Sequence, residues 1–213
     1  MNTRNRFVWA MTAALIAGSA LVSSPTHAAV ALYDFENQPI FTETPFTLVS
    51  AGVSATFAGP SDVDPGAFGI SSNFQSPTGF QYRLMSGDFL TIGSAFGASG
   101  SALTITFSAP ISAFSLDFAL DDPANASTLT FLTNAMGTGT GNGALTSGFR
   151  YPEGVLSYEG PAFTSITFQS NAIDFQIDNL QATVAAVPEP ETVMMFAVGL
   201  VAIALRRRRA VKA

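Results

Sequence analysis

Carboxylates are the side chains of this sequence that could bind a metal ion or take part in catalysis. The segment Ala29–Val187 carries 13 Asp and Glu residues against two arginines, Arg83 and Arg150, so its formal charge is −11. Carboxylate oxygens bind divalent cations, and two carboxylates are enough for glycoside hydrolysis. Glu153 and Glu159 flank a predicted strand and are the pair to consider for hydrolysis, although no other residue supports catalysis.

Several residue types that enzymes commonly use are missing from the same segment. The only His is His27, the only Trp is Trp9, and the segment has no Cys or Lys. These absences exclude a Ser-His-Asp or Cys-His nucleophile, a histidine zinc site and a lysine Schiff base. The acidic charge excludes nucleic acid as a partner, because phosphate contacts need a basic patch. We therefore expect a protein that is not an enzyme.

The elements that must position the carboxylates are short segments in which apolar and polar residues alternate. Such segments, rich in Phe, Thr, Ile and Val and separated by turn residues, are typical of half-buried antiparallel strands. They predict an all-β fold, an antiparallel sandwich or jelly roll. The segments are Val30–Phe35, Val53–Phe57, Phe80–Leu84, Leu103–Phe107, Phe114–Leu120, Thr128–Leu132, Phe163–Phe168 and Ile173–Ile177. Asn134–Gly148 contains five glycines and is predicted to be a long mobile loop.

The last predicted strand changes its alternation part-way. Apolar residues up to Ile177 share one parity, and those from Leu180 onward share the other. The change falls at Asp178-Asn179 and predicts a β-bulge that redirects one acidic side chain.

Both ends of the chain have targeting features. Residues 1–28 have a basic start, an apolar stretch and a small-residue end, which predicts a signal peptide cleaved between Ala28 and Ala29. At the other end, Val193–Leu205 is a run of 13 residues without a charge. As a helix it would reach about 20 Å, which is short of a bilayer core of about 30 Å.

The C-terminal segment resembles the PEP-CTERM sorting signal of exported proteins of Gram-negative bacteria. The resemblance lies in Val187-Pro188-Glu189-Pro190, the apolar run and the cluster Arg206, Arg207, Arg208 and Arg209, in that order. Glu191-Thr192 departs from the Ser or Ala that often follows the second proline. Three parts are thus expected: a signal peptide (1–28), an extracellular β-sandwich domain (29–186) and a sorting signal (187–213) with a short transmembrane helix.

This resemblance implies a route and a location. The Sec translocon would export the chain, and residues 193–205 would hold the precursor transiently in the inner membrane, with the arginines on the cytoplasmic side. An exosortase would then process it, leaving the mature form at the cell surface or outside the cell. The family is associated with exopolysaccharide and biofilm-forming bacteria, so we expect a surface or matrix protein.

A second, looser resemblance is to jelly-roll glycan-binding modules. It rests on Tyr33-Asp34-Phe35-Glu36 and on Phe175-Gln-Ile-Asp178-Asn179-Leu180. In such modules acids near both termini often share a structural calcium, which implies Asp34, Glu36 and Asp178 as ligands. The alternative is that these acids are solvated at strand ends.

The same resemblance leaves a carbohydrate-binding module open as an alternative function. Without Trp in the domain, the aromatic residues that could contact a glycan are Tyr82, Tyr151 and Tyr158, unless they are core residues. Thr-x-Thr pairs such as Thr104-Ile-Thr106 raise a remote alternative, an ice-binding face, but their irregular spacing argues against it. Glycoside hydrolysis is the other remote alternative.

Overall fold

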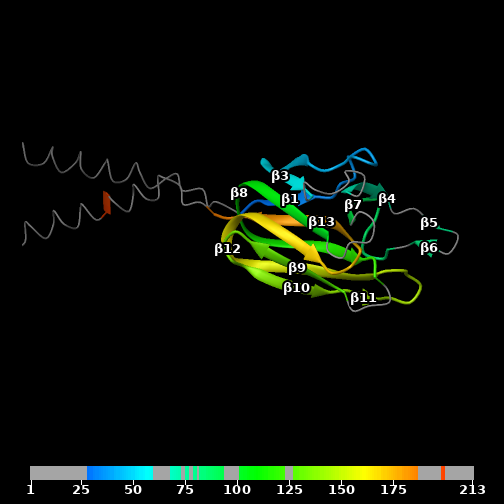
Figure 1. Cartoon of the computed structure of the whole chain (residues 1–213). Helices are drawn as coiled ribbons and strands as arrows, with labels where there is room; N and C mark the ends of the chain where they lie inside the picture. Colours follow the sequence, from blue (N-terminus) through cyan, green and yellow to red (C-terminus); the bar gives the residue numbers. More distant parts are fainter. Residues whose placement is uncertain are drawn as a thin grey trace, which may run out of the picture. The chain divides into compact units, whose positions relative to one another are not determined.

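The described residues fold almost entirely as β-strands (Figure 1). The computed structural model describes residues 28–59, 68–72, 75–76, 79–80, 82–93, 101–122, 127–186 and 198–199. All pairings among the strands are antiparallel. The strands are β1 (Val30–Tyr33), β2 (Phe46–Ser50), β3 (Val53–Ala58), β4 (Phe68–Ser72), β5 (Gln75–Ser76), β6 (Gly79–Phe80), β7 (Asp88–Gly93), β8 (Ser101–Leu120), β9 (Thr128–Thr133), β10 (Thr138–Asn142), β11 (Ala144–Leu145), β12 (Pro152–Ser170) and β13 (Asp174–Val184).

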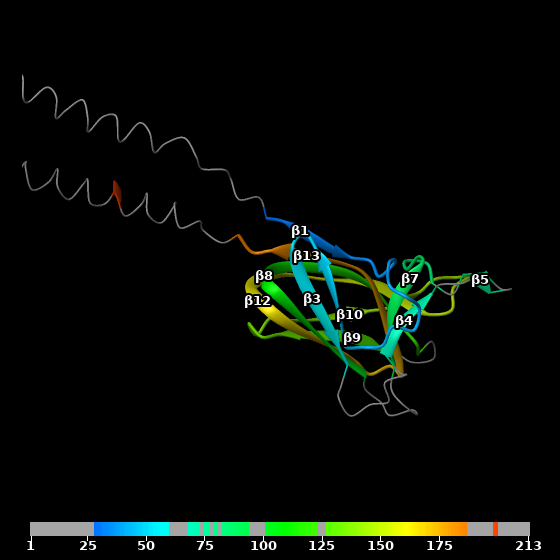
Figure 2. The same cartoon turned by 90° about the horizontal axis from the view of Figure 1, so that it is seen from above.

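Two long strands, β8 and β12, pass through both layers of the fold and curve across the domain in Figures 1 and 2. Near Pro110 and Pro161 their shared ladder is interrupted, with register shifts on both sides of Phe163. The start of β8 and the end of β12 belong to a layer ordered β2-β3-β8-β12-β9-β10. Their other halves belong to a layer ordered β4-β7-β13-β8-β12-β11, with β1 also paired to β13.

Aromatic side chains from the two layers meet in one core. Phe114 of β8 contacts Phe131 of β9 and Phe168 of β12 edge-on, with ring centroids 5.0 and 5.6 Å apart. In the start of β8, alternate residues point into this cluster, as Leu103, Ile105 and Phe107 do, while the residues between them face outward. The predicted all-β antiparallel sandwich is therefore confirmed.

The prediction of a mobile loop at Asn134–Gly148 is wrong. This segment contains β10 and β11, and the glycines of β10 face the core rather than solvent. A Cβ atom at Gly141 would lie 2.8 Å from the Phe118 ring, and one at Gly139 would meet the Phe131 ring. Glycine alternation here reflects close packing of a strand against aromatic rings, which a hydropathy pattern cannot reveal.

The other predicted strands are confirmed apart from Phe80–Leu84, which is wrong. Only its first residue lies in a strand, β6, and Tyr82–Leu84 belongs to a loop. The sequence analysis predicts no strand at β2, β4, β5 or β7. In β7 two of every three side chains are buried, so its sequence has no alternation to detect.

Residues Ala28–Ala185 form one compact unit. The predicted signal peptide up to His27, the motif Val187–Pro190 and the arginine cluster lie outside the described residues. The apolar run Val193–Leu205 also lies outside them, except for residues 198–199. Across the described parts of the chain, no helix is long and apolar enough to cross a membrane.

Candidate functional site

Glu153 binds the loop 82–88 to the outer face of the sheet. It lies at the start of β12 with only 3% of its surface exposed. Its two carboxylate oxygens accept the backbone N–H groups of Arg83 and Leu84, each at 2.6 Å. Hydrogen bonds to an ionised carboxylate are about twice as strong as neutral ones. One buried side chain thus satisfies two consecutive backbone donors of a segment that belongs to no strand.

Two further carboxylates hold the same loop further along. Asp178, which is 1% exposed, accepts the backbone N–H of Ser86. Glu36 accepts the backbone N–H of Asp88 through Oε1 at 3.3 Å. The loop 82–88 is therefore held by three carboxylates that come from β12, β13 and the segment after β1. We call these three residues the carboxylate clasp.

Gly87 lets the loop come close to the clasp. Its φ is +68°, a backbone conformation that residues with a side chain rarely adopt. A Cβ atom at this position would also collide with the carboxylate of Glu36. Both the backbone conformation and the space require glycine between the two donors Ser86 and Asp88.

A β-bulge turns Asp178 toward the loop, as the sequence predicts. The β13–β8 register shifts between Asp178 and Gln181, and Asn179 has a φ of +51°. Asp178 lies opposite Asp117 of β8. The Asn179 amide nitrogen donates to both carboxylates, at 3.0 Å to Asp117 and 3.3 Å to Asp178.

Burial makes Asp178 difficult to ionise. Desolvation is the largest cause that raises the pKa of this carboxyl to about 7, and the negative charges of Glu36 and Asp117 raise it further. The backbone hydrogen bonds from Asn179 and Ser86 act in the opposite direction. Asp178 therefore changes its protonation state close to neutral pH.

The expected calcium ligands are only partly brought together. Glu36 and Asp178 bind one loop, whereas Asp34 lines a groove beside β2. Within the described segments, no three His, Cys, Asp or Glu side chains form a group that could hold a metal ion. Burial of Asp178 also excludes the alternative of a solvated strand-end acid for this residue. Calcium binding stays a prediction.

The predicted tyrosine platform is wrong, because none of the three rings stands open to solvent. Tyr82 and Tyr151 are 7% and 6% exposed and stack on each other at 5.2 Å under the loop, beside Phe89. The Arg150 guanidinium lies 5.1 Å from the Tyr151 ring centroid. Burial raises the pKa of both tyrosines. These rings are a small second core.

Tyr158 is partly buried and packs against the main core instead. Its ring packs against Phe114, Phe131 and Phe163 with centroids 5.5 to 6.1 Å apart. Its buried hydroxyl has no hydrogen-bond partner among the described residues. Tyr158 is thus partly buried against the main core and does not join Tyr82 and Tyr151 in one platform.

The pair considered for glycoside hydrolysis is also wrong. Glu153 and Glu159 lie on the same strand, six residues apart, which corresponds to about 20 Å. Paired glycosidase carboxylates lie about 5–10 Å apart. Glu159 is exposed, whereas both oxygens of Glu153 are already bound to the loop.

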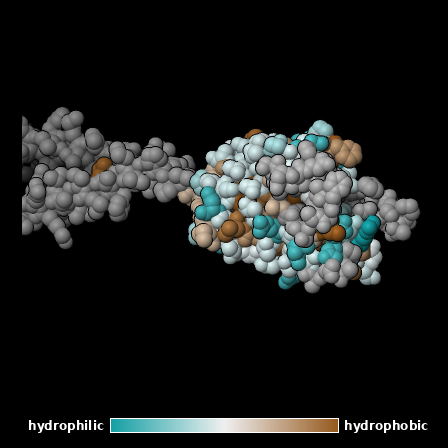
Figure 3. All heavy atoms as spheres, viewed as in Figure 1, coloured by the Kyte–Doolittle hydropathy of each residue, from teal (hydrophilic) through white to brown (hydrophobic). Residues whose placement is uncertain are grey.

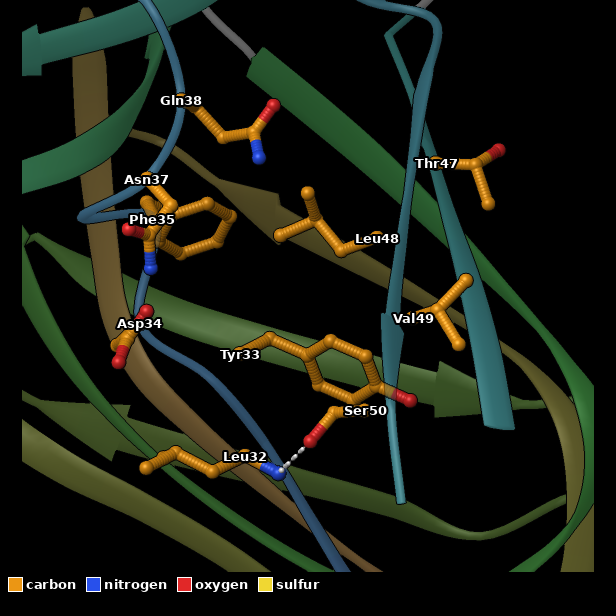
Figure 4. Close-up of a pocket in the computed structure, with 10 residues that line it drawn as sticks. All are labelled: Leu32, Tyr33, Asp34, Phe35, Asn37, Gln38, Thr47, Leu48, Val49 and Ser50. Atoms are coloured by element: carbon orange, nitrogen blue, oxygen red, sulfur yellow. Dashed lines mark hydrogen bonds between the residues drawn. The ribbon is translucent and has the colours of Figure 1, made fainter. Parts of the chain in front are cut away.

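A groove missed by the sequence reading lies between β2 and the segment that follows β1 (Figure 4). Its volume is about 330 Å³, and Asp34, Asn37, Gln38 and Thr47 are among the polar residues that line it. In Figure 4, Gln38 points into the space beside Leu48, whereas Asp34 and Thr47 point away from it. Amides and hydroxyls that both donate and accept can bind an uncharged polar ligand.

The C-terminal end of the sequence provides the family match. Residues 186–209 match the family model described as the PEP-CTERM protein-sorting motif. The chain carries a PEP-CTERM sorting signal. The resemblance of the C-terminal segment to the PEP-CTERM sorting signal is thereby confirmed. A PEP-CTERM signal implies export, processing by an exosortase at the membrane and a final location at the surface or outside the cell.

Comparisons of the whole chain are weaker than the PEP-CTERM match. No curated protein matches the sequence. The K2 cleaved adhesin domain of Lys-gingipain is 14% identical with a TM-score of 0.46, covering 73% of this chain and 100% of that one. A mutant of the carbohydrate binding module CBM29-2 is 16% identical with a TM-score of 0.35, covering 76% and 99%. The catalytic domain of a GH87 α-1,3-glucanase bound to nigerose is 14% identical with a TM-score of 0.36, covering 76% and 29%. At these identities and scores, the likenesses carry no argument about function.

Proposed function

We propose that the protein is a non-catalytic component of the cell surface or of an exopolysaccharide-containing biofilm matrix. The PEP-CTERM signal supports its export and sorting. The observation that carries the non-catalytic role is the carboxylate clasp. Glu153 and Asp178 are buried and accept backbone hydrogen bonds, so they have no free oxygen directed at a substrate. A general acid or base must instead reach the proton that it transfers.

Deleting the gene in the producing bacterium tests this role. We expect less biofilm matrix, restored by the wild-type gene and also by Glu153→Gln, because its amide oxygen can still accept one of the two loop N–H groups and a structural role needs no carboxylate. Reducing sugars released from the producer's own polysaccharide should stay at the level of a protein-free control. A deletion strain with an unchanged matrix, or release of sugars by the purified protein, would contradict the proposal.

A carbohydrate-binding module is the second candidate function, and the groove beside β2 supports it. Asn37 and Gln38 offer amide donors and acceptors there, next to the apolar side chain of Leu48. Ligand sites commonly combine a few polar groups with apolar walls. Asn37→Ala and Gln38→Ala would weaken retention on the producer's polysaccharide if this groove binds it, whereas unchanged retention would reject the groove.

A further inference from the structure

One complete sheet face of this acidic domain carries no charge. The face consists of the outward side chains of β2, β3, the start of β8, the end of β12, β9 and β10, and we call it the threonine face. Throughout these described strands its side chains are Thr, Ser, Ala, Val, Leu, Gln or Asn. The 11 acids that the structure describes between Ala29 and Val187 all lie outside these strand faces. In Figure 3 most of the visible domain surface has the pale colours of intermediate hydropathy, the class of Thr and Ser.

Strand register arranges the hydroxyls of this face in rows across the strands. The first row runs Thr47, Thr56, Thr106 and Ser165 over β2, β3, β8 and β12. The Thr47 and Thr56 hydroxyl oxygens lie 2.8 Å apart and share a hydrogen bond. Neighbouring strands are about 4.8 Å apart, so the row extends roughly 15 Å.

A second row continues the face to its other edge. It runs Thr104, Thr167, Leu132 and Thr138 over β8, β12, β9 and β10. The Thr104 and Thr167 hydroxyl oxygens are 3.0 Å apart. Leu132 is 49% exposed, so an apolar contact lies among the hydroxyls. The face combines hydroxyl groups with accessible methyl and leucine surface.

The chemistry of this face selects an uncharged, hydroxyl-rich partner. Each threonine hydroxyl can donate and accept, as sugar hydroxyls do. With no charged group, the face loses little hydration energy when a neutral ligand covers it. The formal charge of −11 on the segment would repel anionic polymers.

We propose that the threonine face binds a neutral polysaccharide chain. The inference rests on the proposed matrix role and names its ligand class and binding surface. Leu132 and Ala58 interrupt the hydroxyl rows, and antiparallel sheets twist by about 20° from strand to strand. A rigid lattice such as ice needs a regular, flat protein surface, whereas a flexible polysaccharide chain can follow a twisted and irregular surface.

Arginine substitutions on the two outer faces of the sandwich test this proposal. The full chain, in mild detergent, is passed over immobilised curdlan, cellulose and dextran, with alginate as the anionic comparison. We expect retention on at least one neutral polymer and none on alginate. Thr106→Arg and Thr140→Arg, both at exposed positions of the threonine face, should weaken retention at least tenfold. Ser157→Arg makes a similar change on the outer face of the other layer and should stay within twofold.

Other outcomes would overturn the inference. These are no retention on any neutral polymer, retention that both face variants preserve, or retention on alginate alone. Thermal hysteresis of ice growth that Thr106→Arg abolishes would assign the face to ice instead. The proposed matrix role fails separately, when the deletion strain keeps a normal matrix. Unfolding curves of the three variants establish that each is folded before its retention is compared.

Discussion

Asp178 and Asp117 lie directly opposite each other on β13 and β8, and the side chain of Asn179 donates to both carboxylates. Two acids facing each other across a ladder are normally unfavourable. The arrangement is compatible with folding because Asp178 is buried and its pKa is raised to about 7. This relationship makes the stability of the domain depend on pH.

We expect the free energy of unfolding to fall as pH rises from about 4 to 7. The folded state keeps a proton on Asp178 in this range, whereas the unfolded state loses it near the ordinary aspartate pKa of 3.8. The loss should be about 2–4 kcal/mol, with no further contribution from this group above its folded pKa. Urea unfolding of wild type and Asp178→Asn at several pH values measures it.

The variant should have a clearly shallower pH slope, because asparagine does not titrate. Glu159→Gln is the matched control, since Glu159 is exposed and should leave the slope unchanged. Equal slopes for wild type and Asp178→Asn would show that another group controls the pH dependence.

Glu153→Ala should release the loop that the clasp holds. Removing the carboxylate leaves the N–H groups of Arg83 and Leu84 without their acceptor, at a cost of about 1–3 kcal/mol. Arg83 is exposed, so trypsin should cut after it once the backbone opens. Mass spectrometry of timed digests detects the fragment that ends at Arg83.

Glu159→Ala is the control on the same strand, and its cleavage after Arg83 should be as slow as in wild type. If the two variants were cut after Arg83 at the same rate, Glu153 would not hold the loop.

Gly141→Ala should destabilise the domain by about 1–3 kcal/mol, because a methyl group would press on the Phe118 ring. Glycine-to-alanine changes in strands normally stabilise by about 0.5–1 kcal/mol, so the sign itself is informative. Thr140→Ala, on the outward face of β10, is the control. The urea unfolding midpoints of the two variants and wild type measure the change in stability. If the Gly141→Ala variant were more stable than wild type, the glycines of β10 would not be closely packed against the rings.

Replacing Pro188 and Pro190 with Ala should block sorting. The variant should accumulate as a membrane-held precursor, because extended proline-restricted backbone is what a protease cleft can grip. Intact mass spectrometry should find Arg206–Ala213 absent from the wild-type mature chain and present in the variant. Thr192→Ala, which leaves Val187–Pro190 unchanged, is the control. A wild-type mature chain that retains Arg206–Ala213 would argue against exosortase processing.

The bulge at Asp178-Asn179 could be predicted because burial imposes parity on a strand, and a bulge shifts that parity. The glycines of β10 gave no such signal, because hydropathy treats a missing side chain as neutral. A hint was present nonetheless. Glycine at every second residue from Gly137 to Gly143 has the period of a strand, beside segments rich in Phe.

The clasp could not be predicted, because its partners have no sequence signature. Glu153 lies 70 residues from Arg83, and any backbone N–H can serve as its donor. Burial of Tyr82 and Tyr151 depends on the same loop, so their misassignment as a glycan platform has the same cause. Local alternation of apolar and polar residues predicted the strands of both layers. The loop 82–88 covers one layer through contacts between residues far apart in the sequence, which alternation cannot predict.

The position of β13 also determines how the domain would bear mechanical load. β13 is 11 residues long, pairs with β8 along most of its length, and is flanked on its other side by β7 and β1. A pull applied beyond Ala185 along the axis of this strand would be perpendicular to its hydrogen bonds. The bonds then share the force in shear instead of opening one after another. A domain tethered at this end would resist forces such as flowing water exerts on an attached cell.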